Sequence, residues 1–299
     1  MYIKESFIKK ITIGDEITVK KEEVLEYKNA FIYFIGEIIS YGTLIFDNCL
    51  ILCDESTKPG HISVLEGSIS IKNSIIMFAS NEARSFIYAE SDKIDLIECK
   101  LVNCNNFISG TAKQFTMDSC ILNNCSYGIV NIVADKVQIT KNIILNEKLT
   151  SKEDIVSLFY LMGMGDCYIG YNTVVQSDAY RNALTKHNIT QFIFCAPEEN
   201  TKIENCTFID TDYCISGNLI QNCKFYRCKN IIMNGSISPQ VENCVFECCF
   251  EKAFGVELST NNCSETFNID HHKINKFKED IINEANKTIE QHKTIFFMF

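Results

Sequence analysis

A charged segment between residues 176 and 188 holds the best candidates for catalysis. It contains Asp178, Arg181, Lys186 and His187. A polysaccharide lyase uses a base, often Arg or Lys, and carboxylates that hold Ca²⁺ against the acid group of the substrate. A glycosidase instead uses clustered carboxylates as acid and base. The segment contains no pair of Asp residues, so we expect an ordinary solvated insertion, and its residues are catalytic candidates only if the protein is an enzyme.

The sixteen cysteines could in principle bind a metal ion. No two cysteines have the C-x-x-C spacing of common zinc sites, and Cys49 and Cys53, for example, are four positions apart. Ser74 and Asn142 replace Cys at the same repeat position, which a metal site would not tolerate easily. We therefore predict that the thiols pack as small apolar groups in the core. We expect no cofactor and no metal, except Ca²⁺ if the protein is a lyase.

Composition and charge exclude several classes of protein. The net charge is −10 and only three arginines occur, whereas a nucleic-acid binder needs a basic surface. No window holds about twenty uninterrupted apolar residues, so no transmembrane helix is predicted. The first residues, MYIKESFIKKITIGDE, have neither a continuous apolar run nor a small-residue cleavage site. Many cysteines without an export signal favour a cytoplasmic protein with free thiols.

A repeated phrase indicates which elements position these residues. It occurs as IENCTF, IQNCKF and VENCVF between residues 202 and 249, and weaker versions extend back to residue 43. Each copy has an apolar residue, then Asn, Cys and Phe. The aligned Cys residues are Cys206, Cys223 and Cys244. A phrase that recurs about every twenty residues is typical of a solenoid.

The repeat predicts an all-β fold, a right-handed three-sided parallel β-helix. Apolar runs of two or three residues, interrupted by Asn, Asp or Gly, favour three short strands per repeat over helices. Equal positions should stack in successive coils, with Asn at a bend because it tolerates the left-handed conformation. We assign residues 1–263 to the β-helix, with 1–42 as atypical N-terminal coils.

The phrase resembles the repeat of the pectate-lyase-like superfamily. The segments IGYNTVV at 169–175 and YGIV at 127–130 are most similar to that pattern, and the resemblance covers roughly residues 43–256. It implies a right-handed β-helix whose active site, in the enzymes, lies where loops project from one long face. For this chain that implies a site near residues 176–188, although the His-Gly and Arg-x-Lys signatures of the polygalacturonases are absent.

Residues 264–299 differ in character from the repeats. Apolar residues spaced by three or four, from Ile274 to Ile289, predict an amphipathic helix of about four to five turns with Asp270 as its cap. We expect this helix to cap the open end of the β-helix. The last five residues need an apolar partner surface, on the rod or on another chain. These residues are Ile295, Phe296, Phe297, Met298 and Phe299.

Three functions fit the sequence. The first is a non-catalytic scaffold that presents a rigid face to an unknown protein partner or self-associates through its C-terminal tail. The second is a carbohydrate-active enzyme, a polysaccharide lyase or glycoside hydrolase, with its site near 176–188. The third is a trimeric phage or surface fibre. The absence of a catalytic signature favours the scaffold, with neither nucleic acid nor membrane as a partner.

Overall fold

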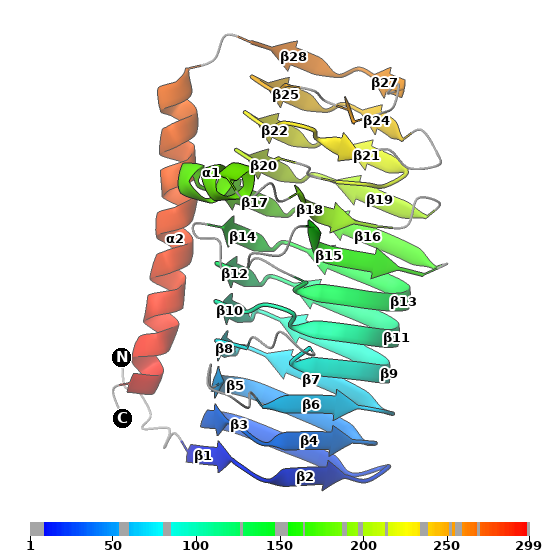
Figure 1. Ribbon diagram of the computed structural model, residues 1–299, viewed down its shortest axis with the longest axis vertical. Coiled ribbons are helices and arrows are strands. Elements are labelled where there is room, and N and C mark those ends of the chain that lie inside the picture. The colour runs from blue at the N-terminus through cyan, green and yellow to red at the C-terminus, as the bar shows by residue number, and fades with distance from the viewer. Residues whose placement is uncertain are drawn as a thin grey trace, which may run out of the picture.

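The computed structural model is a parallel β-solenoid with one long helix along its side (Figure 1). Successive coils pair through parallel strands with matching register. The predicted three-sided parallel β-helix is therefore confirmed. The structure describes residues 9–53, 60–79, 85–125, 128–146, 155–163, 165–186, 190–196, 200–212, 215–233, 239–250, 253–254, 259–267 and 270–297.

Three sheets form the sides of the solenoid, and five long strands bend to take part in two of them. The long strands are β3 (Val24–Phe34), β5 (Thr43–Cys53), β9 (Ile87–Ile97), β11 (Ile108–Asp118) and β13 (Val130–Thr140). Their halves pair with different neighbours, so that each of these strands turns one corner of the solenoid.

We name the three sides by what lies outside them. The polar face contains β7 (Ser68–Lys72), β16 (Asp166–Gly170), β19 (Thr201–Glu204), β21 (Leu219–Gln221), β24 (Gln240–Glu242), β27 (Ser259–Asn261) and halves of the five long strands. The covered face contains β1 (Lys9–Ile13), β8 (Ile75–Met77), β10 (Lys100–Val102), β12 (Ile121–Asn123), β14 (Ile143–Asn146), β17 (Thr173–Gln176), β20 (Thr207–Ile209), β22 (Lys224–Tyr226), β25 (Val245–Glu247), β28 (Ser264–Thr266) and halves of β3 and β5. The open face contains β2 (Glu16–Val19), β4 (Glu37–Ser40), β6 (His61–Val64), β15 (Ile155–Met162), β18 (Thr190–Cys195), β23 (Ile232–Met233), β26 (Ala253–Phe254) and halves of β9, β11 and β13.

Equal side chains stack in the core, as the repeat predicts. Phe208, Phe225 and Phe246 lie at the same position of successive coils and are buried. Neighbouring rings are stacked, with centroids 5.1 Å apart and an interplanar angle of 6°. The coil spacing of a parallel sheet thus brings each ring into contact with the next.

The thiols of the repeat point into the core. Cys206, Cys223 and Cys244 are buried, and each donates a hydrogen bond to the carbonyl two residues earlier. Burial raises the pKa of Cys49 to about 11, so its thiol stays protonated at neutral pH. No group of three His, Cys, Asp or Glu side chains within the described ranges is arranged to hold a metal ion. These observations are consistent with the predicted packing role.

The Asn of the phrase forms the bend between the polar and covered faces. Asn205, Asn222 and Asn243 have φ of 55°, 54° and 53°, in the left-handed region that Asn tolerates. Some of these amides also pair between coils: Asn262 Nδ2 donates to Asn243 Oδ1 at 2.7 Å. The repeat phrase therefore encodes a turn as well as a core.

The last described coil carries polar residues at core positions. Thr260 follows Val241 in the stack, and Glu265 follows Phe246. Both are exposed. A charged residue at an inward position stops further strand pairing, because it cannot be buried without a partner. The sequence of the last described coil therefore prevents a further coil from pairing with it.

The C-terminal helix does not cap this end, contrary to our expectation. Helix α2 (His271–Phe297) runs back along the covered face, beside strands β22 to β8 (Figure 1). Asp270 is its cap, as predicted, since its Oδ1 accepts from the backbone N–H of His272 at 3.1 Å. With 27 residues, α2 is longer than the four to five turns we expected.

Helix α2 lies along the covered face because the strands of this face carry apolar side chains on both sides of the sheet. Ile274, Ala285 and Ile289 are buried against outward-facing residues of the covered face. Those residues are Met77, Val102, Ile121, Ile143, Leu145, Val175, Ile209 and Tyr226. Such a sheet must be covered, because its outer apolar surface would otherwise face water. Among the described residues, no helix combines the length and apolar character needed to cross a bilayer.

The environment of His292 makes the stability of the protein depend on pH. Burial and the nearby Lys100 ammonium lower the pKa of His292 from 6.5 to about 4. The unfolded chain therefore takes up this proton first as the pH falls, and the stability contribution of neutral His292, complete above pH 6.5, is lost towards pH 4. We expect the loss to be about 1 kcal/mol, because partial exposure screens the effect.

The measurement is the difference in unfolding free energy between the wild type and His292→Gln at pH 7 and pH 4.5. The variant should lose less stability than the wild type on acidification. His271→Gln is the matched control, since His271 is exposed on the same helix. Equal pH dependence of the wild type and both variants would contradict the prediction.

Candidate functional site

The insertion that we expected to be a solvated loop forms a short helix. Helix α1 (Asp178–Lys186) is capped by Ser177, whose Oγ accepts from the backbone N–H of Tyr180 at 3.0 Å. The Tyr180 side chain is fully buried and attaches α1 to the solenoid. Asp178 and Lys186 are exposed, and His187 lies outside the described residues. Residues 143–157 are a second insertion expected from the sequence, and of these 147–154 lie outside the described residues.

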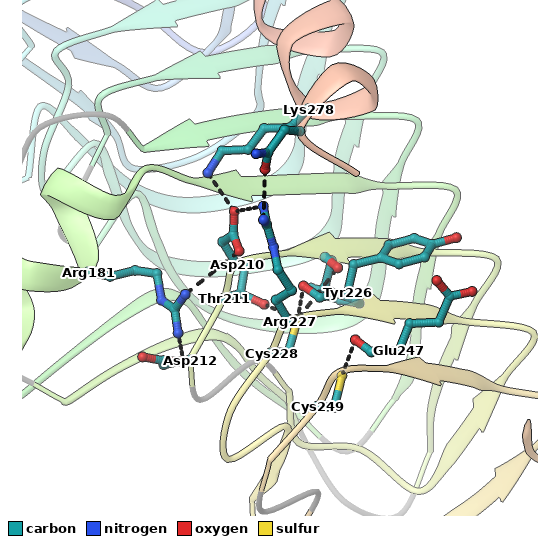
Figure 2. A network of polar contacts seen from close by, with 12 residues as sticks. Arg181, Asp210, Thr211, Asp212, Tyr226, Arg227, Cys228, Glu247, Cys249 and Lys278 are labelled. Atoms are coloured by element: carbon teal, nitrogen blue, oxygen red, sulfur yellow. Dashed lines mark hydrogen bonds and ion pairs between the residues drawn. The ribbon is translucent and has the colours of Figure 1, made fainter. Parts of the chain in front are cut away.

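Arg181 belongs to a network of charges around Asp210 (Figure 2). Asp210 is buried, and its Oδ2 lies 2.7 Å from Arg227 Nη2 and 2.6 Å from Lys278 Nζ. Arg181 Nη1 lies 3.7 Å from Asp210 Oδ1, and its Nη2 donates to Asp212 Oδ1 at 3.1 Å. The network joins α1, two turns of the solenoid and α2. We interpret it as a structural network that holds these elements together.

The structure places one of the four catalytic candidates, Arg181, beside other groups that could take part in catalysis. The structure brings Arg181 beside two carboxylates, Asp210 and Asp212, which the sequence analysis did not single out. Asp178 and Lys186 have no described contact with them. Burial raises the pKa of Asp212, as a general acid requires. Asp210, however, is enclosed by three cations and cannot reach a substrate.

The tail residues that we named for self-association are only partly described. Ile295, Phe296 and Phe297 end α2, and their side chains lie outside the description. Met298 and Phe299 lie wholly outside it. Self-association through the tail therefore stays a prediction.

The open face has a different surface from the other two. On the polar face the outward positions carry mostly Ser, Thr, Gln, Asp and Lys, and the covered face lies under α2. On the open face, Tyr88, Val133, Tyr160 and Met162 are 37–40% exposed although they are large and apolar. Large apolar side chains exposed together on one surface mark interaction sites.

These side chains form two outward columns. One column contains Tyr88, Ser109, Asn131 and Tyr160, which are aligned in successive coils. Beside it lie Glu90, Thr111, Val133 and Met162. The Tyr88 hydroxyl donates to Glu90 Oε1 at 2.5 Å, which fixes the ring on the surface. The columns are held by the sheet backbone, so the surface is rigid.

The corner between the open and polar faces is hollowed into a groove of about 710 Å³. It extends from Lys21 and Glu22 near one end to Val133, Ala134 and Asp135 near the middle of the solenoid. Glu90, Thr111 and Val133 belong both to the groove and to the open face. The groove and the open face are therefore one continuous surface.

Comparison of the chain with protein-family models, with curated proteins and with solved structures finds no match.

Proposed function

We propose that the protein is a non-catalytic scaffold whose open face binds another protein. The observation that carries the proposal is the paired outward columns with Tyr88, Val133, Tyr160 and Met162 exposed on a rigid sheet. Tyrosine and methionine are enriched in protein interfaces, and a mixed apolar and polar surface is typical of them. α2 covers a different face and leaves these columns uncovered (Figure 1).

A carbohydrate-active enzyme of the pectate-lyase-like superfamily is the second candidate. Its support is the solenoid, together with the raised pKa of Asp212 beside Arg181. Catalysis would need a second accessible carboxylate, or carboxylates for Ca²⁺, and Asp210 is occupied by Arg227 and Lys278. We therefore favour binding over catalysis. A trimeric fibre, the third candidate, predicts three times the chain mass in light scattering.

Site-specific photo-crosslinking tests the proposal. A photoreactive residue at Asn131 should crosslink to a host protein, because Asn131 lies at the centre of the open face. Gln240 is the matched control: it is exposed on β24 of the polar face, in a coil that does not line the groove. The captured protein, once purified, should give the same crosslink with the purified scaffold. Crosslinks from Gln240 alone would contradict the proposal.

A further inference from the structure

The groove at the corner has an excess of negative charge. Five carboxylates and two lysines line it, which leaves a net charge of −3. These residues are Glu22, Glu66, Glu90, Asp92, Asp135, Lys21 and Lys113. Lys21 pairs with Glu66 at 3.1 Å and Lys113 with Asp92 at 2.6 Å. All four of these side chains are more than half exposed, so a ligand could replace either pair at little cost.

An aromatic side chain also lines the groove. Tyr41 is 39% exposed and adds an apolar surface beside the carboxylates. Ser91 contributes to the wall only at its backbone, because its side chain occupies the same inward position as Ala112 and Ala134 of the next coils.

The length of the groove matches a short extended segment. The groove runs along the corner between the open and polar faces through six successive coils. In each coil, the strand position next to the groove is aligned with the same position of the neighbouring coil. These positions are Val24, Thr43, Ser68, Lys93, Gln114 and Lys136. At roughly 4.8 Å per coil, the corners span roughly 24 Å, which an extended chain covers with about seven residues.

We infer that the groove binds an extended, basic segment of the partner protein, about seven residues long. This inference rests on the proposed function, because the groove continues into the open face. Lysine and arginine side chains of the segment lie against the carboxylates, and its apolar side chains contact Tyr41. The rest of the partner covers the apolar columns.

The test uses the purified full chain and two fluorescein-labelled heptapeptides, in which Lys or Glu alternates with Ser and Tyr. The lysine peptide should bind, more weakly in 0.5 M than in about 0.05 M salt because exposed charges are screened. The glutamate peptide should not bind. Reversing two groove charges, Glu66→Lys with Asp135→Lys, should weaken binding of the lysine peptide about tenfold. The control is Glu279→Lys with Glu284→Lys on the exposed side of α2, which changes the net charge equally.

Each outcome separates the inference from the proposed function. Equal weakening by the groove and α2 variants would show attraction to the net charge alone and overturn the inference. So would salt-independent binding of a neutral oligosaccharide that competes with the lysine peptide. If the groove variant binds the peptide unchanged while the Asn131 crosslink persists, the inference fails and the scaffold function stands. Loss of the crosslink with peptide binding retained would leave the groove assignment intact.

Discussion

Replacing Phe225 with alanine should lower the free energy of unfolding by about 3–5 kcal/mol. Its ring lies between those of Phe208 and Phe246, with centroids 5.1 Å away on both sides. Removing it leaves a cavity that neighbouring coils cannot close, because the sheet spacing holds their backbones in place. Urea denaturation followed by circular dichroism measures the change.

The control for this substitution is Tyr171→Ala. Tyr171 is 55% exposed at a turn and has few packing contacts to lose. Its replacement should change stability by less than about 0.5 kcal/mol. Similar effects of the two substitutions would mean that the phenylalanine column does not carry the core.

Replacing Asp210 with alanine should cost about 3 kcal/mol. The change leaves Arg181, Arg227 and Lys278 close together without the carboxylate that compensates their charge. Because Lys278 is on α2, the helix should also detach more often from the covered face. Chemical denaturation measures the stability, and the rate of tryptic cleavage within α2 measures the detachment.

Two further variants make this prediction specific. Asp280→Ala, an exposed position on the same helix, should change neither quantity. Adding Lys278→Met to Asp210→Ala should recover part of the lost stability, because it removes one uncompensated cation. An Asp210→Ala protein as stable as the wild type would show that the charge network does not hold α2 and the solenoid together.

The solenoid could be predicted because its signal is local and repeated. IENCTF, IQNCKF and VENCVF each specify a core position, a left-handed turn and a ring, and stacking follows from their equal spacing. The contact between Asp210 and Arg227 could also have been found, since each residue follows its Phe by two positions in adjacent repeats. Lys278 could not, because its partner lies 68 residues away on another element.

The position of α2 was predicted wrongly although the sequence contains a signal for it. The amphipathic pattern requires an apolar surface for the helix but does not say which one. Strands such as IIM at 75–77 and ILN at 121–123 are apolar at consecutive positions, which indicates a sheet buried on both sides.

The open face could not be assembled from the sequence. The strands of the open face come from the least regular part of each repeat. The insertion before Tyr160 makes the alignment of Tyr160 with Asn131 impossible to recognise from spacing. The groove likewise depends on six separate segments that meet at one corner of the solenoid. Only the observed register brings these side chains together.

The affinity of the crosslinked partner for two tyrosine variants tests the central claim most directly. Tyr160→Asp places a charge in the apolar columns of the open face, whereas Tyr171→Asp changes an exposed tyrosine at a turn between the other two faces. With both variants folded by circular dichroism, titration calorimetry should show at least about tenfold weaker binding for Tyr160→Asp and an unchanged affinity for Tyr171→Asp. Equal affinity for Tyr160→Asp and the wild type would contradict the account.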